Sequence, residues 1–143
     1  MMFIGGPYSK TLNQTRLEVL IAHSPDGTSL KNVYHWAQMF YAKKFQKFDY
    51  GKTQNVEFYG QEFPPKYNLS SIQTDTYLFF SDNDYLATPQ DIQTNIFQTM
   101  GPKFLKYHEN LKDYNHLDFM WSITATERIY SKIHHFIHEN KNL

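Results

Sequence analysis

The feature that most constrains the fold is a strand, a loop, a helix and a second strand in succession within about thirty residues. "TYLFF", Thr76 to Phe80, is a short apolar and aromatic run between polar residues, as expected of a buried parallel strand. "KFLKY", Lys103 to Tyr107, offers the second strand. Because parallel strands need a crossover that is usually a helix, this pattern predicts a βαβ unit and an α/β fold.

The segment between the two strands carries the signals of a helix with defined ends. Thr88 suits the N-cap, Pro89 the first helical position, and Asp91 the acidic third position of a capping box. Gly101 offers the stop. A second helix is predicted at the end of the chain, where the apolar residues that share one helical face should pack on the sheet: Ile129, Ile133, Phe136 and Ile137.

The first third of the chain predicts an amphipathic helix with an aromatic face. Ser29 is its candidate N-cap, and apolar residues follow at helical spacing: Leu30, Val33, Trp36, Ala37 and Phe40. The stretch from Phe48 to Ser71 contains glycines and prolines without a sustained period, so it predicts a long connection. We place the boundary between two regions here, at residues 1–58 and 59–143.

Composition excludes several kinds of protein. Fourteen basic residues balance fourteen acidic ones without a long run of either sign, so nucleic acid is not an expected partner. The chain has no cysteine, which excludes disulfides, thiolate metal sites and cysteine nucleophiles. No run approaches the roughly 18 apolar residues of a membrane span.

Two sequons point to the secretory pathway. They lie at Asn13 ("NQT") and Asn68 ("NLS") and are candidate sites of N-glycosylation. The start, "MMFIGGPYSK", lacks the basic and apolar regions of a signal peptide, so none is predicted within this chain.

Acidic residues and a histidine follow the two predicted strands. Asp82 and Asp84 come directly after the first strand, and His116 lies in the loop after the second. Adjacent parallel strands lie about 4.8 Å apart, so these loops can bring an acid and a histidine within hydrogen-bonding distance. Such a pair occurs in the chain order of the α/β-hydrolase triad. The alternative is structural, since aspartates after strands often cap turns.

The blocks "SDNDYLATPQDI" and "YNHLDFMW", preceded by "LNQTRLEVLIAHSPDGTSLKNVYHWAQ", "KFQKFDYG" and "PPKYNLS", resemble the carboxyl-terminal part of the acid lipases. These are the gastric, lysosomal acid and insect lipases of the α/β-hydrolase superfamily. The resemblance implies the last βαβ unit and terminal helix of that fold, preceded by part of a helical cap that extends to about Phe58. Asn68 falls where relatives carry a glycosylation motif.

The resemblance also implies a reaction and its residues. Asp84 matches the triad acid of the family and His116 its triad histidine. The implied reaction is hydrolysis of neutral lipid esters, triacylglycerols and sterol esters, by a secreted or lysosomal enzyme that needs no metal or other cofactor. Where the family commonly has small residues or glycines this chain has Ser81 and Asp82, so Asp82 is a second candidate partner of His116.

The nucleophile of such a triad is not found in the chain. The nucleophile elbow is G-x-S-x-G, and no two glycines are four residues apart in this sequence. Ser81 comes closest among the serines, but it leads into the acidic loop rather than a helix. The chain is therefore expected to be inactive alone, either as part of a longer lipase or as a non-catalytic lipid-binding or interaction protein derived from one.

The remaining histidines have weaker functional signals. His134 and His138 are four residues apart on the predicted terminal helix, a spacing that can hold a metal ion. No third ligand is evident nearby, so no metal site is predicted. His108 is an alternative to His116, while His23 and His35 are interpreted as structural.

Overall fold

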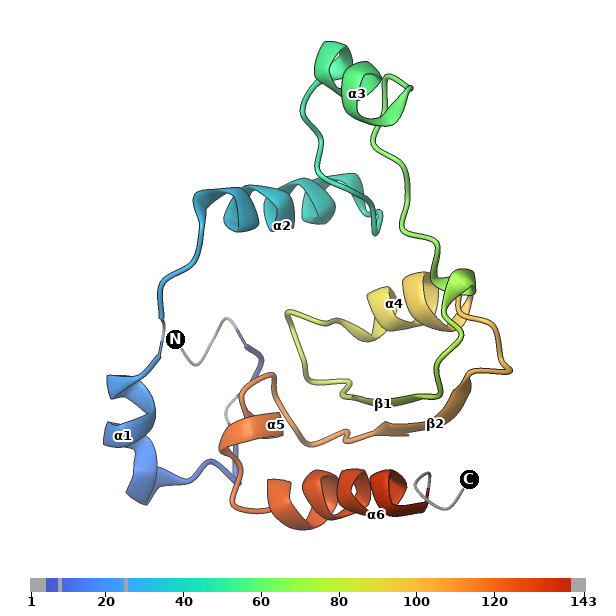
Figure 1. Cartoon of the computed structure of the whole chain (residues 1–143). Coiled ribbons are helices and arrows are strands. Elements are labelled where there is room, and N and C mark those ends of the chain that lie inside the picture. The colour runs from blue at the N-terminus through green and yellow to red at the C-terminus, as the bar shows by residue number, and fades with distance from the viewer. Residues whose placement is uncertain (1–4, 8, 25, 140–143) are drawn as a thin grey trace.

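A computed structural model describes residues 5–7, 9–24 and 26–139 of the chain. Two parallel strands, β1 (Thr76–Phe80) and β2 (Leu105–Asn110), form the sheet. Helices lie on both of its faces: α4 (Pro89–Asp91) and α6 (Ser131–Glu139) (Figure 1). The predicted parallel pair with a crossover is confirmed. Within the described residues β1 pairs with β2 on one side only.

The second strand lies further along the chain than its apolar residues predict. Phe104 belongs to a turn, in which its N–H donates to the Gly101 carbonyl over 3.1 Å, so β2 begins only at Leu105. The strand then continues through polar residues, with His108 opposite Leu78. The predicted range was wrong because ladder pairing with β1, rather than side-chain polarity, decides where β2 ends.

The crossover helix begins as predicted. Thr88 Oγ1 accepts the Asp91 N–H over 3.2 Å and donates to the Asp91 carboxylate over 2.8 Å, with Pro89 in the first helical position. After α4 the backbone widens into a π-helical segment, η3 (Ile92–Phe97), which ends before the predicted stop at Gly101.

The hydrophobic core lies between the loop that follows β2 and the helical segments at the end of the chain. Leu111 and Tyr114 are fully buried, and Ile129 is nearly so. Phe79 of β1 and Phe119 pack against this cluster. Two further helical elements surround it: α5 (Asp118–Trp121) and the π-helical segment η4 (Thr126–Tyr130).

The terminal helix α6 packs on the sheet through one aromatic residue. Phe136 stacks on Tyr77 of β1 and also contacts Tyr107 of β2, with ring centroids 4.4 and 4.9 Å apart. Ile133 and Ile137 remain 38% and 51% exposed, beside a groove of about 100 Å³ that Tyr77 and Phe136 complete. The predicted apolar face therefore exists, but only part of it is covered.

The first half of the chain is helical and stands apart from the sheet (Figure 1). Ser29 Oγ accepts the Asn32 N–H over 3.2 Å, so the predicted N-cap of α2 is confirmed. No helix in the described residues is long and apolar enough to cross a bilayer. The elements of this half are η1 (Gln14–Arg16), α1 (Leu17–Ala22), α2 (Leu30–Ala42), α3 (Lys52–Tyr59) and η2 (Leu69–Ser71).

Helix α3 lies inside the stretch that was predicted to be a long connection. The prediction was wrong for the residues of this helix. Its sequence has no apolar period, and the helix is held by polar contacts of the buried Asn55. The Asn55 side chain accepts the Tyr50 N–H over 3.0 Å and donates to Asp49 over 2.7 Å and to the Glu62 carbonyl over 2.9 Å. A helix fixed by one buried amide has no hydrophobic period from which it could be predicted.

Candidate active site

The loop after β1 fixes the carboxylate of Asp84. This side chain is only 4% exposed. Its Oδ1 accepts the N–H groups of Leu86 and Ala87 over 2.8 and 2.9 Å. Two backbone donors on one oxygen hold the carboxylate in place and leave Oδ2 to face the neighbouring loop.

The loop after β2 brings His116 to this carboxylate. His116 Nδ1 lies 3.0 Å from Oδ2 and 3.2 Å from Oδ1 of Asp84. Because a carboxylate only accepts hydrogen bonds, Nδ1 carries the proton and donates it. The second ring nitrogen, Nε2, is then the basic one. Asp84 and His116, 32 positions apart in the sequence, thus form a dyad at the carboxyl ends of both strands.

The other candidate partners do not take part in this dyad. Asp82 is exposed, and its side chain accepts from Asn110 Nδ2 over 2.7 Å. His108 lies within β2, and its ring packs on Phe97 of η3, with ring centroids 5.0 Å apart. Of the two acids, Asp84 is therefore the one that faces His116.

Ser81 joins the two loops rather than facing the histidine. It is fully buried, and its Oγ donates to the Tyr114 carbonyl and accepts the Asn83 N–H over 3.0 Å. The contact with Tyr114 ties the acid loop to the histidine loop, and the contact with Asn83 holds the turn within the acid loop.

The dyad shifts the titration of both partners. Burial alone would raise the pKa of Asp84, but its hydrogen bonds from His116 and from the Ala87 and Leu86 N–H groups outweigh burial and lower the pKa. The hydrogen bond to Asp84 raises the pKa of His116 above its ordinary 6.5, although burial opposes this. The dyad therefore favours an imidazolium beside a carboxylate.

This coupling gives a pH-dependent prediction. Replacing Asp84 with Asn should lower the pKa of His116, because the hydrogen-bonded charge that raises it is lost while burial remains. In the unchanged chain, the raised pKa contributes stability that is fully present below 6.5 and lost as the pH rises through the folded pKa. NMR titration of the His116 ring measures the pKa, and urea unfolding at about pH 5.5 and 8.5 measures the stability.

Asp82→Asn is the matched control for this titration, because that carboxylate bonds to Asn110 instead of His116. It should leave the pKa of His116 unchanged. An equal decrease in both variants would contradict the assigned partner.

A buried polar network around His116 was missed by sequence reasoning. Asp118 is fully buried; it accepts from Ser9 Oγ and, over 2.8 Å, from the Asn115 N–H. Asn115 in turn accepts the Leu117 N–H over 2.9 Å and donates to the Pro7 carbonyl over 3.0 Å. The signal was two polar residues close to His116 in "YNHLDF", Asn115 directly before it and Asp118 two positions after it, next to an apolar run.

Residues 5–7 fit between the acid loop and the histidine loop. The Gly5 carbonyl accepts the His116 N–H over 2.8 Å. Gly6 has a φ of +124°, and a Cβ built on it would lie 2.0 Å from the Asn83 carbonyl oxygen and 3.1 Å from Asn115 Cβ. Only glycine fits there, so this glycine strap, Gly5 to Pro7, connects the two loops that form the dyad.

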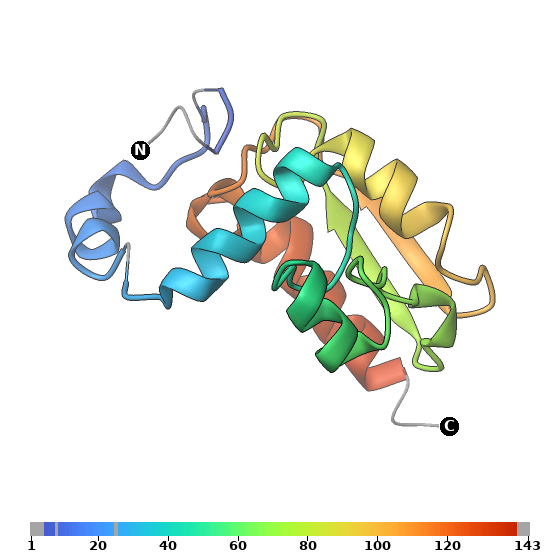
Figure 2. The same ribbon diagram turned by 90° about the horizontal axis from the view of Figure 1, so that it is seen from above.

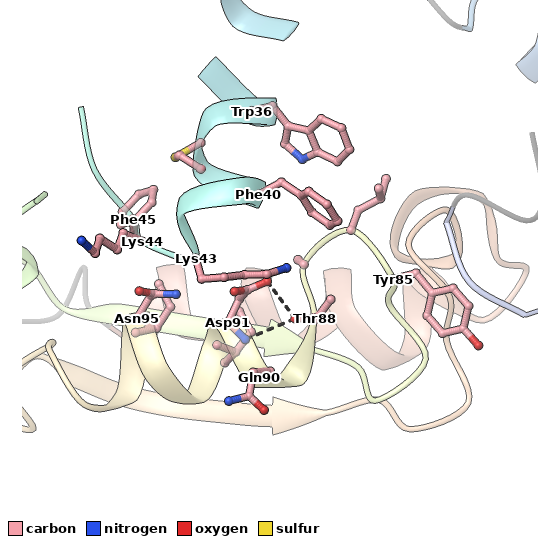
Figure 3. A pocket seen from close by; sticks show the side chains of 15 residues that line it. Trp36, Phe40, Lys43, Lys44, Phe45, Tyr85, Thr88, Gln90, Asp91 and Asn95 are labelled. Carbon is pink, nitrogen blue, oxygen red and sulfur yellow. Dashed lines mark hydrogen bonds between the residues drawn. The ribbon is translucent and has the colours of Figure 1, made fainter. Parts of the chain in front are cut away.

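An apolar cavity opens beside the acid loop. It has a volume of about 610 Å³ and is lined by the end of α2 and by the segment that runs from the acid loop into α4 and η3 (Figure 3). Figure 2 shows the end of α2 beside the loop that leads into α4. Trp36 and Phe40 reach into it from α2, and Leu86 and Ala87, whose N–H groups hold Asp84, form part of its wall. This volume is within the range of small-molecule sites.

The other predicted positions take no part in the dyad. Asn68 is exposed, whereas Asn13 is half-buried and its N–H donates to the Trp121 carbonyl. His35 Nε2 lies 2.8 Å from the Gln46 carbonyl oxygen, in a structural contact, and His23 follows the end of α1. No cluster of three or more metal-binding side chains occurs in the described part of the chain.

Curated lipases match nearly the whole chain. It is 39% identical over 133 residues to lipase lipl-1 of Caenorhabditis elegans, 40% identical over 139 residues to gastric triacylglycerol lipase of Bos taurus, and 39% identical over 131 residues to lysosomal acid lipase/cholesteryl ester hydrolase of Rattus norvegicus. The alignments cover 93%, 96% and 91% of this chain. The chain spans about a third of the length of these relatives (33%, 34% and 32%). No family model matches it.

Proposed function

The chain belongs to the acid lipase family, and we propose that it is part of a carboxylic ester hydrolase that acts on triacylglycerols and sterol esters by a serine–histidine–aspartate mechanism. The observation that supports this best is the contact between Asp84 and His116, with Oδ2 and Nδ1 3.0 Å apart. Lipases are the relatives that match the chain, and a hydrolase of this kind uses a buried acid to orient a histidine.

In this mechanism the two residues have distinct roles. Nε2 of His116 removes the proton from the serine hydroxyl as the hydroxyl attacks the ester carbonyl, and later returns a proton to the leaving alcohol. Asp84 holds the imidazole in the tautomer with the proton on Nδ1 and stabilises the imidazolium. The raised pKa of His116 agrees with that stabilisation. The serine would lie outside these 143 residues, which contain no G-x-S-x-G.

The two regions of the chain would contribute differently. We assign residues 1–58 to part of a helical cap and residues 59–143 to the carboxyl-terminal part of the hydrolase core. The cavity lies where the two regions meet, and its apolar walls suit an acyl chain of the substrate. The family further suggests a secreted or lysosomal protein, with the exposed Asn68 as the more accessible glycosylation site.

The test is to express these residues together with the protein encoded upstream of them in the same reading frame, and to measure hydrolysis of an emulsified triacylglycerol. Asp84→Asn should lower kcat by about 10⁴-fold and His116→Ala by about 10⁶-fold. Asp82→Asn is the matched control and should retain the activity. Equal losses in Asp82→Asn and Asp84→Asn, or an active His116→Ala variant, would refute the assigned roles.

A second candidate is a non-catalytic lipid-binding protein derived from a lipase. The exposed aromatic face of α2 favours it, since Trp36 and Phe40 are 51% and 54% exposed beside the cavity. The upstream transcript distinguishes the two. A continuous reading frame that encodes G-x-S-x-G supports the hydrolase, and a start site at Met1 without such an upstream frame supports the binding protein.

A further inference from the structure

Two exposed histidines on α6 take no part in the Asp84–His116 dyad. His134 and His138 lie one helical turn apart, and their rings face each other with centroids 4.3 Å apart. Their Nε2 atoms are 3.1 Å apart. The backbone of α6 fixes this spacing, because residues four apart lie on the same face of a helix.

We propose that His134 and His138 form a bidentate binding site for a divalent transition-metal ion. Zinc–nitrogen bonds to histidine are about 2.0–2.1 Å long. Two such bonds that meet at about 98° span the observed 3.1 Å, and this angle lies between square-planar and tetrahedral geometry. One ion can therefore bind both nitrogens with little movement of either ring.

The donor set selects the kind of ion. Neutral imidazole nitrogens suit Zn²⁺, Ni²⁺ and Cu²⁺, whereas Ca²⁺ and Mg²⁺ prefer oxygen ligands. The described residues provide no third metal-binding side chain at this position, so water would complete the coordination shell. This missing third ligand is the reason that sequence analysis predicted no metal, but the two converging nitrogens are enough for a chelate.

A neighbouring pair on the same helix provides a comparison. His135 Nε2 lies 3.2 Å from Glu139 Oε1, also across four residues. This pair combines one imidazole with one carboxylate, which already interact with each other. The His134–His138 pair offers two imidazoles. Both Nε2 atoms must be unprotonated to bind the ion, so the contact between them is replaced by two bonds to the metal.

Zinc titration of the intact chain by calorimetry tests the site and does not depend on hydrolase activity. We expect one Zn²⁺ per chain at this position. Either His134→Gln or His138→Gln should weaken binding by about 100-fold, because a single imidazole loses the advantage of a linked second ligand. His135→Gln is the matched control on the same helix and should bind as the unchanged chain does.

NMR spectra of the histidine rings locate the ion independently of affinity. The ring signals of His134 and His138 should shift together on addition of Zn²⁺, while those of His116 stay in place. Unchanged binding in the double variant, loss of binding in His135→Gln, or no binding at about 1 mM Zn²⁺ would overturn the proposal. Circular dichroism checks that each variant is folded.

Discussion

Purified as these 143 residues alone, the chain should hydrolyse tributyrin no faster than its own His116→Ala variant. The proposed acid and base are present, but they act only through a serine nucleophile. In subtilisin, loss of the serine costs about 2 × 10⁶ in kcat, and the remaining rate comes from the oxyanion hole and substrate binding. Donors of that hole belong to the nucleophile segment and an early strand, so this remaining rate should also be lost.

The assay needs a positive and a negative reference. The longer protein that we propose would provide the first, and His116→Ala in the short chain provides the second. Turnover by the short chain that disappears in His116→Ala would contradict the prediction. It would show that a nucleophile within these residues reaches the dyad.

Replacing Gly6 with alanine should loosen the histidine loop more than the same replacement of Gly5, the other glycine in the strap. An alanine would be strained at a φ of +124°, and its Cβ would lie 2.0 Å from the Asn83 carbonyl oxygen. The backbone strain alone destabilises the bound strap by about 1–3 kcal/mol, and the clash with Asn83 adds to this. We therefore expect the strap to separate from the two loops. The bond from the His116 N–H to the Gly5 carbonyl would then break.

Hydrogen exchange at the His116 amide measures this loosening directly. In Gly6→Ala we expect exchange about tenfold faster or more, which corresponds to about 1.4 kcal/mol. Gly27→Ala is the matched control, since a Cβ on Gly27 meets nothing within 4 Å. Unchanged protection of His116 in Gly6→Ala would show that the strap does not support the loop.

Local signals predicted the parts of the fold that depend on local interactions. The Thr88 and Ser29 caps are confirmed because an N-cap needs only a hydroxyl near its own helix. The β2 strand was displaced, since pairing with β1 extends it past its apolar residues as far as Asn110. Helix α3 was missed because the buried Asn55, rather than an apolar face, holds it.

The candidate site also has a part that the sequence predicts and a part that it does not. The approach of an acid and His116 follows from the order of strands and loops. The choice between Asp82 and Asp84 does not, because it depends on Asn110 binding the first and two backbone N–H groups binding the second. The contact between the strap and the histidine loop joins residues more than 100 positions apart, for which no spacing rule exists.

The outer edge of β1 has a consequence for handling the chain. Within the described residues β1 has only β2 as a hydrogen-bonded neighbouring strand, and the half-buried Tyr77 lies beside the exposed Ile133 and Ile137. A sheet edge next to an apolar groove can accept a strand from another molecule. At high concentration the chain should therefore self-associate through this edge, and a lysine introduced there would act as a gatekeeper against aggregation.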